Sequence, residues 1–279
     1  MSHPSSEPAG RTPDGSAGQA AQPQPVDPAA LTDSAGVPWK GRAFQENPHA
    51  GDDGSASPEL ALALAEFIGC AGSQIAVVDA LRTARLLIPL LAERGDEGVG
   101  HNGLLVDKTQ ELAIVTVAAP DGRRVLPLFS DVAAMARWDA AARPVPSDGI
   151  RAALAAAADN TDLLVIDPGS DTEFVVRRPA VWAIAQGEPW APSWQSPDVR
   201  QAFLESIATE LAVIDVQLAA GDPQARLRGP ELVVSLELLA GLSATELDAV
   251  LARLAGRWAA DDRIAVLVDS LTIKLVRSA

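Results

Sequence analysis

The sequence lacks tyrosine and contains one cysteine and three histidines among its 279 residues. A lone thiol, Cys70, cannot form a disulfide within the chain and cannot build a zinc site from thiolates. His3 and His49 lie in a polar N-terminal segment, so His101 is the one histidine of the expected folded part. The sequence also has no GxSxG, Walker or HExxH motif. We therefore expect no catalytic residues, no metal site and no cofactor.

Basic residues and long apolar runs are scarce as well. Lys and Arg number 22 against 37 Asp and Glu, which gives a formal charge of -15. This sign opposes the phosphate contacts on which nucleic-acid binding depends. No apolar run approaches the roughly 20 residues of a membrane-spanning helix, and residues 1–35 show no signal-peptide pattern. We expect a protein of the cytoplasm with no nucleic-acid and no membrane partner, a location that the single cysteine fits.

The first 57 residues differ in composition from the rest of the chain. Fifteen of them are Gly or Pro, few are large and apolar, and acidic residues outnumber basic ones. Because such a segment buries too little area to offset the entropy lost on ordering, residues 1–57 are predicted to be a mostly disordered acidic leader. An island at residues 37–54 contains Trp39 and Phe44, which either dock on the folded body or belong to a sticky linker.

The remaining residues predict an α+β fold with two domains, at residues 58–190 and 198–279. The order strand, turn, strand, helix occurs three times, starting near residues 112, 162 and 211. This order predicts mixed, largely antiparallel sheets with ββα units packed against helices. The stretch at residues 187–197, rich in Pro and Trp, is the expected boundary between the domains.

Local signals place the individual elements. Helices are expected at residues 58–69, 73–83, 130–138 and 147–158, from 179 onward, and at 196–209 and 243–258. The expected N-caps include Ser130, Ser147 and Ser243, the last in a capping box with Glu246. Paired strands are expected at 111–117 with 123–129, 161–167 with 173–176, 211–219 with 231–239, and 263–269 with 271–276. Residues 85–92 form a further strand, in which Pro89 predicts an edge position or a bulge.

Residues 98–103 spell GxGxxG, a motif that places a pyrophosphate at a helix N-terminus in dinucleotide-binding folds. Here the motif leads into a β-rich run, so the helix that must follow it is missing. We expect a loop and no bound nucleotide at this place. The carboxylate pairs Asp52-Asp53 and Asp261-Asp262 lie in polar turns, where adjacent acids are usually solvated and do not bind metal.

The most informative polar residues are arginines that lie between the predicted elements. Arg178 lies at an expected helix start, where its charge opposes the helix dipole and requires a partner. One interpretation is that the arginines pair with the surplus acidic residues. The other is a pocket that accepts an acidic peptide or a small anion through bidentate contacts. The candidate binding surface consists of Arg124, Trp138, Arg143, Arg177 and Arg178, together with Trp39 and Phe44.

Between residues 36 and 190 the sequence resembles the SseB N-terminal domain family, in the form found in high-GC bacteria. The resemblance rests on the short matches Pro127-Leu128-Phe129, Trp138, Arg143-Pro144-Val145-Pro146, Asp167-Pro168 and Arg178-Pro179-Ala180. It implies an α+β domain followed by a separate C-terminal domain. Names within the family refer to enhanced serine sensitivity or to a type III secretion SseB-like protein. Neither name defines a biochemical activity, so the resemblance carries over no catalytic residue.

The absence of catalytic motifs favours a non-enzymatic binding or regulatory protein of the cytoplasm, whose partner is another protein or a second copy of itself. The alternative is a small-molecule or anion sensor, or an enzyme, that uses an Arg- and Trp-lined cleft near Trp138 and Arg143. A convergent cleft with perturbed carboxylates would favour this alternative, and a flat surface would oppose it. A secretion-apparatus component would need a long coiled coil or a membrane-active helix, and the sequence shows neither pattern.

Overall fold

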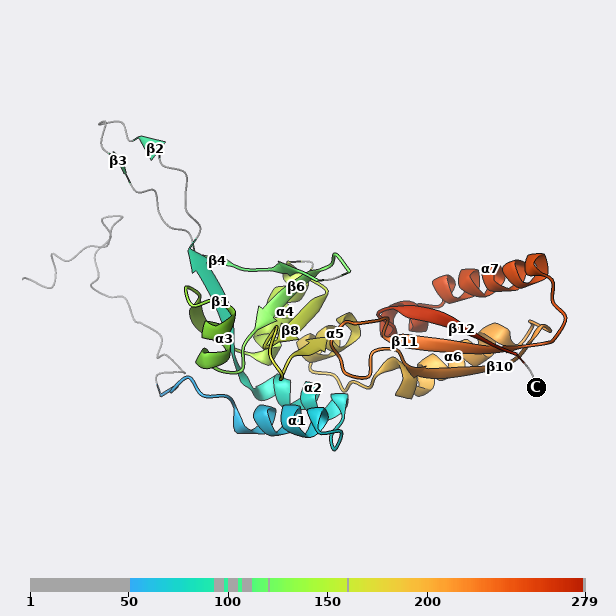
Figure 1. Cartoon of the computed structure of the whole chain (residues 1–279), viewed down its shortest axis with the longest axis horizontal. Helices are drawn as coiled ribbons and strands as arrows, with labels where there is room; N and C mark the ends of the chain where they lie inside the picture. The colour runs from blue at the N-terminus through green and yellow to red at the C-terminus, as the bar shows by residue number, and fades with distance from the viewer. Residues whose placement is uncertain are drawn as a thin grey trace, which may run out of the picture. The chain divides into compact units, whose positions relative to one another are not determined.

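The computed structural model describes residues 51–92, 98–99, 105–106, 112–119, 121–159 and 161–277 (Figure 1). These residues form helices together with mixed and antiparallel sheets, which confirms the α+β fold. Trp39, Phe44, most of the GxGxxG stretch and the predicted disorder of residues 1–50 lie outside the described residues. Among the helices of the described residues, none combines the length and the hydrophobicity of a membrane-spanning helix.

The first sheet is built around the strand β1 (Arg85–Ala92). Two helices, α1 (Pro58–Ile68) and α2 (Gln74–Thr83), precede it, close to the ranges that the sequence predicts. Strand β1 lies between β4 (Leu112–Ile114) and β7 (Arg143–Asp148) and is antiparallel to both. The sheet therefore joins segments that are far apart in the sequence.

The prediction for Pro89 is wrong, because β1 is the central strand of its sheet and its registers with β4 and β7 run without a bulge. Leu87 exchanges backbone hydrogen bonds of 2.9 Å with Phe129, whereas the ladder with β4 begins at Leu90. Backbone N–H groups alternate in direction along a strand, so Pro89 faces the same side as Leu87. On that side it lies between the bonds to Phe129 and the ladder with β4, where no partner needs its missing N–H. Across the other interface Pro89 faces Pro144 of β7, where neither residue has an N–H to donate.

The second sheet has the order β5-β6-β8-β9. Its strands are β5 (Val117–Ala118), β6 (Arg124–Leu128), β8 (Leu163–Ile166) and β9 (Phe174–Val176). The predicted hairpin of 161–167 with 173–176 is confirmed, since β8 pairs antiparallel with β9. The predicted pair of 111–117 with 123–129 is confirmed only at its turn end, where β5 pairs antiparallel with β6, because Leu112–Ile114 forms β4 and pairs with β1 instead. Strands β6 and β8 are parallel, and their crossover contains α3 (Val132–Trp138), β7 and α4 (Gly149–Ala158). The short strands β2 (Gly98–Val99) and β3 (Leu105–Val106) pair with each other.

The N-caps of α3 and α4 differ from the prediction by one residue. Asp131 caps α3 and Asp148 caps α4, each through a carboxylate that accepts a hydrogen bond from a backbone N–H three residues later, at 2.6 and 2.8 Å. Ser130, the predicted cap of α3, instead donates its hydroxyl to the buried carboxylate of Asp167 at 2.7 Å. Both serines lie beside an acid that caps equally well, so the sequence pattern alone does not choose between the two residues.

Buried side chains of α1, α2, α4 and α5 (Arg178–Gln186) pack against β1 and the second sheet. Gly149, the first residue of α4, lies so close to α2 that a Cβ there would come within 1.8 Å of the Leu81 carbonyl oxygen. This close approach requires glycine at the position. The largest members of this cluster are Leu60, Leu64, Leu81, Leu86, Leu128, Leu164, Ile166 and Phe174.

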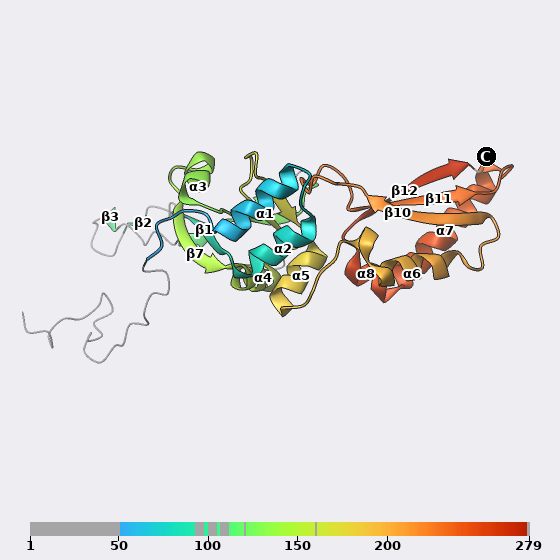
Figure 2. The same cartoon turned by 90° about the horizontal axis from the view of Figure 1, so that it is seen from below.

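Residues 193–277 build a third sheet covered by helices. Its elements are η1 (Ser193–Gln195), α6 (Pro197–Ile207), β10 (Val213–Ala220), β11 (Leu232–Leu238), α7 (Ala244–Ala260), α8 (Asp262–Leu267) and β12 (Leu271–Arg277). Figure 2 shows α6, α7 and α8 along one side of this sheet. The predicted antiparallel pair is confirmed as β10 and β11, and the predicted capping box of Ser243 and Glu246 begins α7. A second buried cluster, which includes Phe203, Leu236, Leu254 and Trp258, lies between these helices and the sheet.

The strand predicted at residues 263–269 is wrong, because α8 occupies most of this segment. Asp261 caps the helix by accepting a hydrogen bond of 2.9 Å from the Arg263 N–H, and Ile264 and Val268 are buried four residues apart on one face. Strand β12 pairs with β11 instead of with residues 263–269, and the two strands are parallel. Parallel strands cannot be joined by a tight turn and need a longer crossover connection. Helices α7 and α8 supply the crossover that a parallel pair requires.

Residues 51–279 form one compact unit, although their buried side chains fall into separate clusters. Ala225, from the loop between β10 and β11, belongs to the cluster around α1 and α2, and its carbonyl accepts a hydrogen bond of 2.7 Å from the Val175 N–H. This loop therefore links the third sheet to the second. The division into domains at residues 58–190 and 198–279 stays a prediction.

Asp167 joins the ends of β6 and β8. The residue is 1% exposed and has a positive φ of 47°. Its carboxylate accepts hydrogen bonds from the N–H and the hydroxyl of Ser130, at 2.8 and 2.7 Å, and from the hydroxyl of Thr172 at 3.0 Å. A single side chain thus satisfies donors from two segments of the second sheet.

We predict that Asp167→Ala lowers the free energy of unfolding by about 3 kcal/mol, because it leaves buried donors without an acceptor and places alanine at a positive φ. Urea unfolding followed by circular dichroism measures this change. Asp171→Ala, an exposed position in the same turn, is the matched control and should change stability by less than about 0.5 kcal/mol. Equal losses for the two variants would contradict the structural role of Asp167.

Candidate functional site

Arg177 is a buried basic residue of the described chain. It follows β9 and is the N-cap of α5, and its side chain is 9% exposed. Its Nη2 donates to Asp222 Oδ2 and to the Gly229 carbonyl, both at 2.8 Å, while Nη1 lies 3.0 Å from Asp269 Oδ2. Two carboxylates therefore compensate a buried positive charge that also opposes the helix dipole.

Asp269 is shared with a second arginine, Arg123. The Nη1 of Arg123 lies 2.7 Å from Asp269 Oδ1, and its Nε lies 2.8 Å from Asp121. Burial alone would raise the pKa of Asp269, but hydrogen bonds from Arg123 and Arg177 outweigh burial and hold this pKa below its usual value of 3.8. We name Arg123, Arg177, Asp222 and Asp269 the arginine junction.

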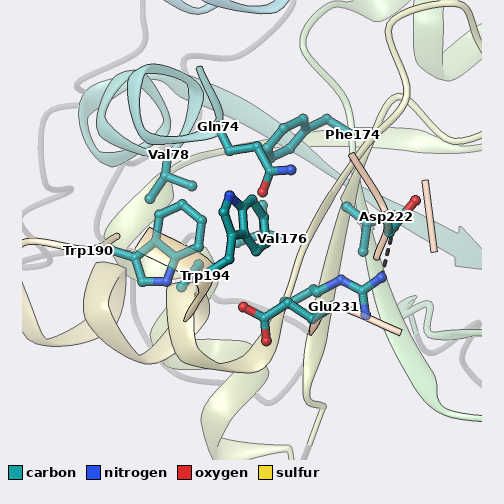
Figure 3. Close-up of a pocket in the computed structure, with 11 residues that line it drawn as sticks. Gln74, Val78, Phe174, Val176, Trp190, Trp194, Asp222 and Glu231 are labelled. Carbon is teal, nitrogen blue, oxygen red and sulfur yellow. Dashed lines mark hydrogen bonds and ion pairs between the residues drawn. The ribbon is translucent and has the colours of Figure 1, made fainter. Parts of the chain in front are cut away.

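Glu231 is buried beside the arginine junction. Its carboxylate accepts hydrogen bonds from the backbone N–H groups of Asp269, at 2.6 Å, and Ser193, at 3.2 Å. Burial raises the pKa of Glu231, because these bonds and the nearby charges do not fully replace lost hydration. Figure 3 shows the indole rings of Trp190 and Trp194 near Glu231 in the small cavity that these residues line. The cavity has a volume of about 10 Å³, which is room for about one water molecule and not for a substrate.

An open groove of about 610 Å³ adjoins the arginine junction. Arg123 lines it but is already bound by the carboxylates of Asp121 and Asp269. Arg228 is the one charged lining residue that has no ion pair with a described residue. Since the acids and bases of this groove balance one another, it offers little excess charge to hold an anion.

Arg178 neighbours Arg177 in the sequence but contacts different groups. Its guanidinium lies 5.2 Å from the centre of the Trp182 ring, and its Nη2 donates to the carbonyls of Ala265, at 3.0 Å, and Val268, at 3.1 Å. These carbonyls lie near the end of α8, where a positive charge complements the helix dipole. Arg178 therefore has the partner that its place at a helix start requires.

The other predicted binding residues have separate surroundings. Arg124 forms an exposed ion pair of 2.7 Å with Asp159, and half-buried Trp138 packs on Phe129 with ring centres 5.3 Å apart. Arg143 is exposed at the start of β7 and has no ion pair with a described residue. The predicted residues 124, 138, 143, 177 and 178 share no hydrogen-bond or ion-pair partner among the described residues. Their role as one binding surface stays a prediction.

In each acidic pair one residue forms an ion pair, whereas Asp53 and Asp262 are exposed as the sequence predicts. Asp52 lies 2.8 Å from Arg85 with its side chain 17% exposed, and Asp261 lies 2.6 Å from Arg263 while it caps α8. Within the described residues, no group of three or more His, Cys, Asp and Glu side chains is arranged to hold a metal ion.

Sequence reasoning missed the carboxylates of the arginine junction. Asp222 lies in the Gly- and Pro-rich loop between β10 and β11, and Asp269 lies at the predicted turn before β12. Polar loops commonly contain acids, and nothing in the local sequence marks these two as buried.

Exposed apolar side chains gather at the end of the third sheet where β11 and β12 finish. Leu211 is 90% exposed, Leu239 is 49% exposed and Leu275 is 44% exposed. Two open grooves of about 430 and 580 Å³ meet at Leu242, which lines both. We name this surface the apolar tip, and it comprises Leu211, Leu239, Leu242, Leu247, Leu275 and Val276.

We predict that Asp269→Asn destabilises the protein in a pH-dependent way. The folded-state pKa of Asp269 is lowered, so its ionised form adds stability above pH 3.8, and this stability is lost as the pH falls through the folded-state pKa. At neutral pH the variant should lose about 3 to 5 kcal/mol of unfolding free energy, because buried Arg177 is left with less negative charge. Urea unfolding at a series of pH values measures the gap, which should narrow below pH 3.8.

Asp248→Asn, at an exposed position on α7, is the control and should follow the unsubstituted protein at every pH. A gap for Asp269→Asn that stays constant from neutral pH to about pH 3 would contradict the assigned pKa shift.

Comparison with known proteins identifies the N-terminal part of the chain. Residues 60–183 match the family model described as SseB protein N-terminal domain. The match covers β1, the second sheet and helices α2 to α4, and it includes Arg123 and Arg177 of the arginine junction. No curated protein and no solved structure matches the chain. Residues 60–183 of this chain therefore form an SseB N-terminal domain.

Proposed function

We propose that this protein acts in the cytoplasm by binding another protein through the apolar tip, without chemistry of its own. The observation that carries the proposal is the exposure of Leu211, Leu239 and Leu275 at one end of the third sheet. Exposed apolar side chains that are grouped and bordered by charged residues, here Glu210, Glu246, Arg253 and Arg257, commonly mark a protein interaction site. Covering it with a partner stabilises a complex by about 25 cal/mol per Å² of apolar area removed from water.

The carboxylates with shifted pKa values favour a binding protein over an enzyme. Asp269 is held by Arg123 and Arg177, and Glu231 by backbone N–H groups, so both carboxylates are already engaged as hydrogen-bond acceptors. The enclosed cavity beside Glu231 has about 10 Å³, whereas small-molecule sites occupy about 300 to 1,000 Å³. Asp269 lines the open groove of about 610 Å³, but its carboxylate is already bound by two arginines. These carboxylates therefore fit a structural role at the arginine junction.

Arginines contribute less to the proposed interface than the sequence led us to expect. Arg124 and Arg177 have carboxylate partners and Arg178 has carbonyl partners, which leaves Arg143 as the arginine of the predicted set without an ion pair to a described residue. A sensor or enzyme built on Trp138 and Arg143 stays an alternative without a specific observation in its favour.

We predict that Leu239→Glu abolishes partner recovery, because it places a charge in the apolar tip. The exposed side chain makes few core contacts, so the melting temperature should change by no more than about 2 °C. Quantitative affinity purification from the cells that express the protein compares the variant with the unsubstituted chain. The matched control is Leu62→Glu on α1, where the leucine is 60% exposed.

Partners recovered with the unsubstituted chain and with Leu62→Glu, but lost with Leu239→Glu, support the proposal. Recovery of the same partners by all three proteins would overturn it.

A further inference from the structure

Strand β12 has an unpaired outer edge. In the order β10-β11-β12 it is the last strand, and within the described residues it pairs with β11 alone. The Leu232 N–H donates to the Ser270 carbonyl at 3.0 Å, so residues 270, 272 and 274 direct their backbone groups toward β11. Because these directions alternate along a strand, Ile273 and Leu275 direct their N–H and C=O groups outward.

The apolar tip adjoins this edge. Leu275 and Val276 line the groove of about 430 Å³ together with Leu247 and residues 238–242, and none of the lining residues is charged. Leu275 pairs with the buried Leu236 and so lies on the helix-covered face of the sheet, whereas the neighbouring Lys274 lies on the open face. An added strand would therefore contact leucine on one face and lysine on the other.

The charge of β12 is opposite to that of the whole chain. The strand contains Lys274 and Arg277 and no acidic residue, in a chain whose formal charge is -15. Lys274 is exposed and has no ion pair with a described residue. A lysine on an edge strand also discourages unspecific pairing. A second copy of this chain would bring the same basic strand and a further large negative charge, so an acidic partner segment fits this edge better.

We propose that β12 accepts an extended partner segment in which acidic and apolar residues alternate, as an added strand of the third sheet. This proposal rests on the proposed function, because it names the kind of partner that the apolar tip binds. Backbone hydrogen bonds to Ile273 and Leu275 would hold the segment, its apolar side chains would cover Leu275, and its acids would lie near Lys274. Main-chain bonding supplies affinity, and the alternating side chains supply specificity.

The first test uses peptides as probes. A capped peptide of about eight residues that alternates Val and Glu should bind the full chain at least about tenfold more tightly than one that alternates Val and Lys. Isothermal titration calorimetry at low ionic strength measures both dissociation constants. Lys274→Glu should remove or reverse this preference, whereas Arg151→Glu, at an exposed arginine on α4, should preserve it.

The second test removes the outward backbone donor. Leu275→Pro eliminates an N–H that the ladder with β11 does not use, so the variant should keep its helical circular dichroism and lose the Val-Glu peptide by at least about tenfold. If this variant fails to fold, Lys274→Glu alone decides, and an unchanged peptide preference overturns the proposal. Equal binding of the two peptides, or binding that survives both substitutions, also overturns it.

The outcomes separate strand addition from protein binding in general. Loss of partners with Leu239→Glu, together with unchanged peptide binding in Leu275→Pro and Lys274→Glu, would overturn strand addition and leave the proposed function standing. If partner recovery is unaffected by all of these substitutions, both proposals fail. Sedimentation that shows a dimer lost with Leu275→Pro would assign the edge to a second copy and overturn the acidic partner.

Discussion

The buried guanidinium of Arg177 is the interaction on which the arrangement of residues 51–277 depends. Its side chain is 9% exposed, so the charge must be met by carboxylates, which come from positions 45 and 92 residues further along the chain. Asp222 lies in the loop before β11 and Asp269 in the turn before β12. Loss of one partner leaves the remaining charges buried and unpaired, a state that costs more than an apolar replacement of the whole set. The ion pairs therefore favour a single placement of these two loops against α5.

The loop between β10 and β11 has a strained backbone in this placement. Ala225 and Leu227 have positive φ angles of 50° and 54°, a strained backbone that persists only where its surroundings hold it. The Val175 N–H donates to the Ala225 carbonyl at 2.7 Å, and the Leu227 N–H donates to Asp222 Oδ2 at 2.7 Å. Asp222 thus binds both the strained loop and Arg177. The same loop covers part of β9, which is an edge strand of the second sheet.

Sequence patterns predicted the parts of the fold that local physics determines. The hairpins and the Ser243 capping box follow from turn residues and helix capping, which act over a few residues. The segment 263–269 was predicted wrongly because a short apolar run fits a strand or a helix, and only its pairing partner far away in the sequence decides. For the same reason the sequence singled out Arg177 but not its partners. Among 37 acidic residues, only the folded structure shows that the side chains of Asp222 and Asp269 are 3% and 1% exposed and lie against Arg177.

The composition of the apolar tip sets limits on how it can bind. Interface hot spots are typically Trp, Tyr and Arg, whereas this surface presents aliphatic side chains, Leu239 and Leu275 among them. Each leucine buries less area than an aromatic anchor and fixes no hydrogen-bond direction, so leucines alone would give an adaptable contact of low specificity. The outward backbone groups of β12 supply the direction that leucine lacks, because strand pairing fixes register and spacing. Specificity in a surface of this kind therefore depends on the strand edge and Lys274, and the leucines contribute mainly affinity.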